Sequence, residues 1–309
     1  MKPAKFAYVR AESVDQVVEV LDGRDGEAII LAGGQTLLPL LSTRLARPDV
    51  VVDINHVAEL SGIDLRDGER GRELIIKACT RQADALASPL TQEHVPLLVK
   101  AISFIGHQQT RNRGTVGGSL SHADPASEIP LAALTLDAWV SLRSVSGTRR
   151  VALSDYFIGP MMTARADNEI LLAVHFPLDQ KSTGIGKGTG TGTGFHEVSE
   201  RRGDFAVVAA AALIQLDQGG ICTHAALAIG GAGGTPLRIT ALEDQLTGSG
   251  INEQIIKAAL PMISAAIDPD SDQHAAAAYR ERVACQLAER ALLDALADAL
   301  ADVLVGAGP

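Results

Sequence analysis

Two glycine pairs, each next to apolar residues, constrain the fold of this chain more than any other feature of the sequence. Gly33 and Gly34 follow an apolar run, and Gly117 and Gly118 lie between a Thr-Val dipeptide and Ser119. Glycine reaches positive φ and lets a backbone approach a ligand that a Cβ would exclude. Successive N–H groups in such turns can bind a phosphate. One Gly-Gly pair is most often only a turn, but two such loops predict two segments that close on one anionic ligand.

The spacing of the first loop argues against a dinucleotide-binding Rossmann unit. That fingerprint requires G-x-G-x-x-G at the start of a helix, whereas Gly33-Gly34 is soon followed by Pro39. A repetitive glycine run at 184–194 contains Lys187 but no G-x-x-x-x-G-K-[ST] phosphate-binding motif. Repeated glycine is typical of flexible linkers, so we expect residues 179–194 to connect two domains.

Composition narrows the class of protein. The chain has 309 residues, is 46% hydrophobic and has a formal net charge of −10. A net negative charge argues against binding to nucleic acid, because the phosphates require a basic protein surface. It also argues against binding to an anionic membrane surface. No apolar run approaches the ~20 residues of a membrane span. The N-terminal residues lack the apolar core of a signal peptide, so we expect a cytoplasmic protein.

Cysteine and histidine spacing argues against a metal or disulfide framework in this chain. The three cysteines, Cys79, Cys222 and Cys285, are widely separated and form no C-x-x-C. An iron–sulfur cluster takes four thiolates at close spacing, so we expect none here and interpret each cysteine as a small buried hydrophobe. The eight histidines show no zinc-ligand spacing. No G-x-S-x-G nucleophile motif is present either.

Periodicity and capping signals predict alternating helices and strands. Ser13 and Gln16 are typical of a helix capping box, and the apolar run at 169–176 predicts a central buried strand. The run at 205–216 and the run at 221–229 predict a hairpin. Further strands are expected at 27–32, 50–54, 138–143 and 149–153, and helices at 14–21, 80–86, 95–105, 129–136, 241–246, 252–266 and 275–304.

The longer motifs around these loops resemble a known family. Residues 32–39 (AGGQTLLP), 112–120 (NRGTVGGSL) and 122–125 (HADP) are similar to the flavin loops of the FAD-binding medium subunit of molybdenum hydroxylases. This is the flavoprotein chain of the carbon monoxide dehydrogenase and xanthine dehydrogenase family. Residues 202–206 (RGDFA), Asp272 and Tyr279-Arg280 resemble its C-terminal domain. The glycine repeat before Phe195 departs from the family pattern, which is less repetitive there.

The resemblance implies an α+β protein with two sub-domains that form an FAD-binding fold of the vanillyl-alcohol-oxidase type (PCMH-like), followed by an α+β C-terminal domain. We expect the first sub-domain at 1–57, the second at 58–178, the linker at 179–194 and the C-terminal domain at 195–309. The family binds FAD non-covalently. Molybdopterin and two [2Fe–2S] clusters reside in a large and a small partner subunit of a heterotrimer, and the large subunit selects the substrate.

Cofactor-binding residues follow from the same resemblance, one position at a time. Glu128 matches an acidic residue near the polar tail of the cofactor, and Ile105 and Leu171 match apolar positions beside its rings. Phe195 falls where some relatives stack a tyrosine on the flavin, and His196 where others have a lysine. The full set is Leu31, Ala32, Gly33, Gly34, Gln35, Thr36, Leu37, Leu38, Ile105, Thr115, Val116, Gly117, Gly118, Ser119, His122, Asp124, Glu128, Leu171, Phe195 and His196.

Several alternatives stay open at this point. Arg111 and Arg113 face either phosphate oxygens or solvent, and His122 is either a surface residue or part of the site. No catalytic residue is expected, because a flavin carries the redox chemistry itself. The resemblance implies that the chain transfers electrons from a partner's clusters to an acceptor. A free-standing flavin oxidase and a non-enzymatic nucleotide-binding module are the other candidates.

Overall fold

The computed structural model describes residues 2–24, 26–68, 71–178 and 190–306. Its first unit is a parallel three-stranded sheet in the order β1-β3-β2 (Ala7–Arg10, Val50–Asp53, Ala28–Leu31). Helix α1 (Val14–Asp22) begins at Ser13, whose side chain accepts a hydrogen bond from the Gln16 N–H, as the capping prediction requires. The helix buries its apolar face against this sheet. Helix α2 (Leu37–Thr43) follows β2 and the first glycine loop.

The second unit is an antiparallel five-stranded sheet in the order β4-β5-β10-β6-β7. These strands span Ile63–Gly68, Gly71–Lys77, Ile170–Pro177, Trp139–Ser144 and Gly147–Ala152. The apolar β10 lies between β5 and β6, as predicted. One sheet face packs on a core that includes α3 (Gln82–Ala87), α5 (Pro96–Phe104), α7 (Val116–His122) and α8 (Glu128–Thr135). All eight residues of α8 are buried.

Shorter elements complete this second unit. They are the 3-10 helix η1 (Ala58–Leu60), helices α4 (Pro89–His94), α6 (Gln108–Arg113) and α9 (Leu153–Tyr156), and the small hairpin β8-β9 (Phe157–Gly159, Met162–Thr163).

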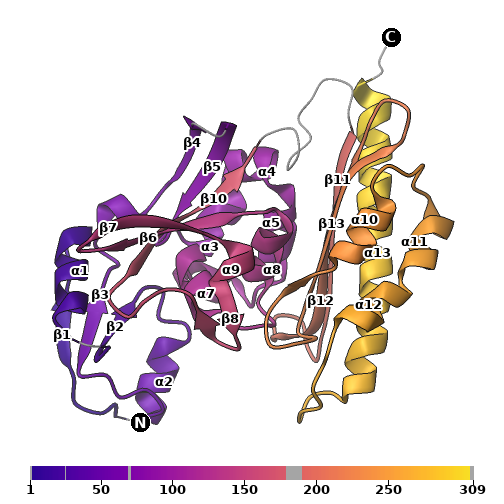
Figure 1. Ribbon diagram of the computed structural model, residues 1–309. Helices are drawn as coiled ribbons and strands as arrows, with labels where there is room; N and C mark the ends of the chain where they lie inside the picture. Colours follow the sequence, from indigo (N-terminus) through magenta and orange to yellow (C-terminus); the bar gives the residue numbers. More distant parts are fainter. Residues whose placement is uncertain (1, 25, 69–70, 179–189, 307–309) are drawn as a thin grey trace.

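The C-terminal part is an antiparallel sheet in the order β11-β12-β13-β14 (Gly190–Ser199, Ala206–Leu216, Cys222–Gly230, Leu237–Arg238). Helices α10 (Thr240–Leu246), α11 (Glu253–Ala259), α12 (Pro261–Ala266) and α13 (Ala277–Gly306) lie on one side of it (Figure 1). Helices α5 and α8 pack on the other side. Because both faces are covered, every residue of β12 is buried. The predicted hairpin and the whole molecule's α+β class are confirmed.

The predicted linker is wrong for residues 190–194, which begin strand β11. Gly190, Gly192 and Gly194 alternate along this strand and therefore point to one face. A Cβ on any of them would overlap the backbone of α13, at Ala299, Ala295 and Ala291 respectively. The glycines therefore permit a close strand–helix contact. The remainder of the predicted linker, including Lys187, lies at 179–189, outside the described residues.

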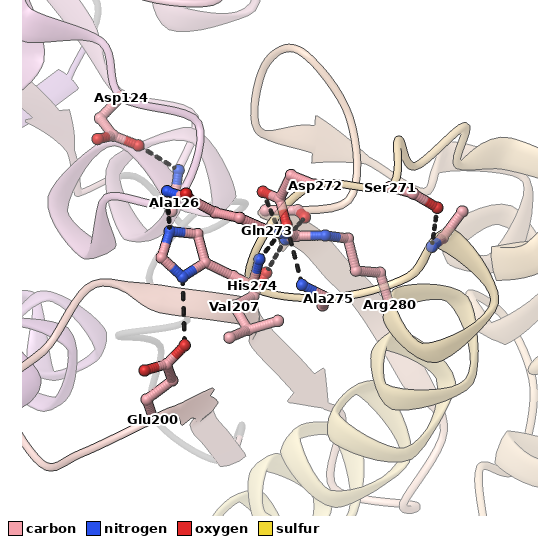
Figure 2. Close-up of polar contacts among 12 residues, drawn as sticks. Asp124, Ala126, Glu200, Val207, Ser271, Asp272, Gln273, His274, Ala275 and Arg280 are labelled. Atoms are coloured by element: carbon pink, nitrogen blue, oxygen red, sulfur yellow. Dashed lines mark hydrogen bonds and ion pairs between the residues drawn. The ribbon is translucent and has the colours of Figure 1, made fainter.

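A polar network fixes the start of α13 to the sheet. Arg280, only 8% exposed, donates to the carbonyl oxygens of Val207 and Gly231 and pairs with Asp272 at 2.7 Å. This ion pair holds the pKa of Asp272 below its usual range. Figure 2 shows the adjoining loop, where the His274 ring reaches Glu200 at 3.2 Å just after β11. This contact joins the loop before α13 to the segment that leads from β11 to residues 203–205.

Candidate functional site

A cavity of about 530 Å³ lies where the three sheets and their loops meet. The loop after β2, the segment leading into α7, and the start of β10 contribute to its wall. The C-terminal part contributes Gly203, Asp204 and Phe205. This volume falls within the ~300–1,000 Å³ of typical ligand and cofactor sites.

Most of the residues predicted from the sequence line this cavity. They are Ala32, Gly33, Gly34, Gln35, Thr36, Leu37, Ile105, Thr115, Gly117, Gly118, Ser119, His122, Glu128 and Leu171. Four others lie behind or beside the wall: Leu31 ends β2, Leu38 is on the exposed side of α2, Val116 is buried, and Asp124 caps a turn by accepting from the Ala126 N–H. Thus the structure brings both glycine loops to one cavity.

The first loop presents unused backbone donors. Gly34 has φ +72°, a left-handed conformation that favours glycine. No hydrogen bond in the described part of the chain uses the N–H groups of residues 33–37. Buried or partly buried N–H groups are nearly always paired in native proteins. These successive free donors beside a cavity form a concave site that suits an anion.

The second loop has a different role from the one predicted, because its N–H groups are bound within the protein. Val116 donates to Thr80 O at 3.0 Å, Gly117 to Ala78 O at 2.9 Å, and Gly118 to Thr115 Oγ1 at 3.1 Å. A Cβ on Gly117 would lie 2.6 Å from Ala78 Cα. The expectation that both loops direct N–H groups at a ligand is therefore wrong for this one, whose glycines are needed for close packing.

Direct contact joins the two glycine segments. A Cβ on Gly33 would overlap Arg113 O and lie 2.9 Å from Gly114 Cα. Arg113 O also accepts a hydrogen bond from Arg81, and the Arg111 guanidinium donates to Ile105 O at 2.7 Å and to Gly106 O at 3.2 Å. Neither arginine side chain lines the cavity. Arg111 instead supports the wall at residues 105–106.

Phe195 and His196 lie away from the cavity. The Phe195 ring is buried, 5.2 Å from the Phe104 ring on α5. His196 points to the other face of β11 and meets Asp294 of α13 at 2.8 Å. The aromatic residue on the cavity wall is Phe205, which is 67% exposed. The 202–206 motif was available in the sequence, but nothing local in it indicates that Phe205 faces the site.

The fold also brings to the cavity two polar residues, Gln82 and Arg165, that no sequence motif marks. Gln82 lines it from α3, and its buried Oε1 has no hydrogen-bond partner among the described atoms. Arg165 lines it from the loop before β10 and is the one arginine or lysine among the lining residues of the described chain. Its Nη1 donates to Ala166 O and Glu169 O.

Other candidate chemistry is not assembled in the described residues. They contain no group of three His, Cys, Asp or Glu side chains placed to hold a metal ion. Burial raises the pKa of the Cys79 and Cys222 thiols to about 11, which disfavours the reactive thiolate. Among the described helices, none has the length and apolarity needed to cross a bilayer.

The fold thus brings the first glycine loop, the segment leading into α7 and residues 203–205 to one cavity of the size of a cofactor site. Residues 4–179 match the family model described as the FAD binding domain in molybdopterin dehydrogenase. Residues 193–295 match the CO dehydrogenase flavoprotein C-terminal domain. The chain therefore belongs to the FAD-binding flavoprotein subunits of the molybdenum hydroxylase family.

Individual relatives support this assignment over nearly the full chain. The alpha subunit of the 6-hydroxypseudooxynicotine dehydrogenase complex of Paenarthrobacter nicotinovorans is 36% identical over 96% of each chain. The glyceraldehyde dehydrogenase medium chain of Sulfolobus acidocaldarius is 35% identical, over 95% of this chain and 99% of the relative. The carbon monoxide dehydrogenase structure from Hydrogenophaga pseudoflava superposes with a TM-score of 0.89 at 32% identity, covering 97% of this chain and all of that one.

Proposed function

We propose that this chain is the FAD-carrying electron-transfer subunit of a heterotrimeric molybdenum hydroxylase. It would receive electrons from the [2Fe–2S] clusters of a small subunit and deliver them to an external acceptor, while a large molybdopterin subunit oxidises the substrate. The observation that carries the proposal is the cavity with free N–H groups at residues 33–37. A bound flavin supplies the redox chemistry, and the protein sets its position and potential.

The residues present fit an FAD molecule. The unused donors of the first loop would hold the pyrophosphate, because such N–H arrays bind phosphate oxygens. Apolar walls from Ile105 and Leu171 and the exposed Phe205 would pack on flat rings. We assign the lining residues predicted from the sequence, from Ala32 to Leu171, to this cofactor. Residues 1–57 and 58–178 would be the two halves that enclose it, and residues from 190 onward would complete the wall.

The purified chain by itself tests the assignment. We expect a visible flavin spectrum with one FAD per chain and electron transfer from a strong artificial reductant to a dye. We expect no turnover of any hydroxylase substrate, because the chain supplies neither a cluster ligand set nor a metal site in its described part. Turnover should appear when the large and small subunits are added.

Two outcomes would contradict the proposal. Substrate-dependent dye reduction by the isolated chain, at a rate comparable to that of the whole complex, would favour a free-standing flavin oxidase. Nucleotide binding without flavin would favour a non-enzymatic nucleotide-binding module.

A further inference from the structure

The side chain of Asn55 holds the first glycine loop by its backbone. Asn55 lies just after β3, and its side-chain amide donates to Ala32 O at 2.8 Å. The Ala32 carbonyl and the Gly33 N–H belong to one planar trans peptide unit and therefore point in opposite directions. Fixing this carbonyl directs the Gly33 N–H away from Asn55. That N–H is the first of the donors at residues 33–37 that have no partner in the described part of the chain.

The amide of Asn55 is itself held in one orientation. Its Nδ2 also donates to Asp53 Oδ1 at 2.6 Å, and its Oδ1 accepts from the Arg81 guanidinium at 2.7 Å. Asp53 is buried and accepts a further hydrogen bond from the Tyr8 hydroxyl at 2.6 Å. Two acceptors beside the nitrogen and a donor beside the oxygen permit one assignment of the amide. The amide therefore cannot turn away from the loop without losing its other partners.

Arg81 connects this amide to the second unit. It lies just before α3, and its guanidinium donates to Asn55 Oδ1 through one nitrogen and to Arg113 O, at 2.6 Å, through the other. Arg113 O is the backbone atom that a Cβ on Gly33 would overlap. A planar guanidinium presents its donors in a fixed geometry, so it holds its two acceptors at a fixed spacing. The loop is thus held at two successive residues, Ala32 and Gly33, by groups that Arg81 joins.

Neither Asn55 nor Arg81 is among the residues that line the cavity. Their side chains contact backbone atoms behind the wall, whereas the loop residues 32–37 form part of the wall itself. These two side chains can therefore influence a ligand only through the loop. Loss of either one would change the direction of the N–H donors without removing a direct contact with the ligand.

We propose that Asn55 and Arg81 are cofactor-positioning residues, which join the first and second units and aim the N–H groups of the first loop at the pyrophosphate of FAD. This inference rests on the proposed function, because it takes FAD as the ligand. Asn55 belongs to the first unit and Arg81 to the second, so the donor array depends on the contact between the two units.

A double-mutant cycle on FAD affinity tests whether the two residues act together. Asn55→Ala removes the hydrogen bond to the loop, and Arg81→Lys keeps the positive charge but loses the two-nitrogen fork. We expect roughly tenfold weaker FAD binding for Asn55→Ala and roughly fivefold weaker binding for Arg81→Lys, the usual effect of one lost hydrogen bond. Because both substitutions release the same loop, the double variant should bind roughly tenfold more weakly, not with the roughly fiftyfold product of independent effects.

Phosphorus NMR of the FAD-loaded chain supplies a readout that a loss of stability alone would not change. The two phosphorus resonances of FAD report the hydrogen bonds to its pyrophosphate, and both substitutions should shift them toward the positions of free FAD. Circular dichroism with thermal unfolding establishes that each variant is folded at the temperature of the titration. Arg81→Lys keeps the charge and most of the side-chain volume, so it carries the same test with a smaller disturbance of the fold.

Two control variants make the same substitutions away from the loop. Arg143→Lys alters an arginine that also bridges the first and second units, through a 3.5 Å contact with Asp15 of α1. Asn252→Ala removes an asparagine whose side chain caps helix α11. Both variants should keep the FAD affinity and the phosphorus resonances of the native chain.

Three results would overturn the inference while leaving the proposed function in place. They are native FAD affinity in Asn55→Ala and Arg81→Lys, weaker binding with unchanged phosphorus resonances, and a double variant that shows the full product of the single losses. Equal losses in the control variants would also overturn it, because the effect would then be one of general stability. A native chain that binds no FAD would overturn the proposed function, and this inference with it.

Discussion

At the scale of single residues, Gly34 shows how one conformation prepares a site. Its φ of +72° turns the chain after β2 and leaves the N–H groups of residues 33–37 without partners in the described structure. A side chain at this position would also press on Leu38, whose Cδ1 lies 2.9 Å from the ideal Cβ position. A substitution at this residue would therefore affect both the backbone geometry and the packing of the first glycine loop.

We predict that Gly34→Ala lowers FAD affinity by at least tenfold while the protein stays folded. The left-handed conformation costs a non-glycine residue ~1–2 kcal/mol, which the loop can relieve by changing φ and misdirecting its donors. Gly220→Ala is the matched control, because Gly220 has φ +78° with no atom within 4 Å of an added Cβ and lies in the β12–β13 turn. Flavin fluorescence titration with circular dichroism measures both effects. Equal FAD loss in the two variants would contradict the role of the first loop.

At the scale of elements, strand β11 packs closely on helix α13 because the residues at their contact have small side chains or none. Alternate glycines on the strand face alanines spaced by four along the helix, so the two backbones approach directly. At the far side of the strand, Phe195 joins the core shared with α5. One strand thus connects the C-terminal helices to the cofactor-binding part.

We predict that Gly192→Ala destabilises the C-terminal part by roughly 1–3 kcal/mol or more, the usual cost of overpacking a close contact. Its Cβ would overlap Ala295 O, a backbone atom that cannot rotate away. Gly250→Ala serves as the control, since its nearest neighbour, Ile221 Cδ1, would be 3.9 Å away. Thermal unfolding measures the difference. Equal transition temperatures for the Gly192→Ala and Gly250→Ala proteins would contradict the prediction and show that α13 shifts to accommodate the added methyl group.

At the scale of the whole molecule, the cavity exists only because separate units meet. The first sheet supplies the loop at 32–37, the second supplies α7 and the start of β10, and the C-terminal sheet supplies residues 203–205. Gly203, at φ +89°, would place a Cβ 3.1 Å from the backbone of Gly106, so the wall closes by direct backbone contact. Lys100 of α5 adds a bridge to Asp298 of α13 at 2.8 Å.

We predict that FAD binding slows hydrogen exchange at residues 33–37 and at residues 203–205 together. A ligand that contacts all three units stabilises the folded state of the segments that contact it, so these segments unfold locally less often. Helices α11 and α12, on the far side of the C-terminal sheet, serve as the internal control and should exchange at an unchanged rate. Mass spectrometry of peptides from the free and FAD-loaded chain measures this. Protection confined to residues 33–37 would show that the C-terminal part does not close on the ligand.

Local patterns were enough to predict many elements of this fold. The Ser13 cap, the buried β10 and the β12–β13 hairpin follow from interactions between near neighbours or from apolar periodicity. The motifs around Gly33 and Gly117 also marked two segments that line one cavity. The family follows from the same motifs, because their order and length are specific.

What the sequence alone determined is therefore the class of elements, the family and the two glycine segments, since each depends on residues close together in the chain. Which N–H groups remain free depends on contacts between segments far apart in the chain, because Ala78 O and Thr80 O, which accept from the second loop, follow strand β5. Residues 190–194, which the sequence predicts to be part of a linker, form the start of β11. Helix α13 packs closely on their glycines, and this contact between distant segments cannot be predicted from the glycine repeat alone. Phe205 lines the cavity from the loop just before β12, whereas the Phe195 side chain, on β11, is buried against Phe104 of α5.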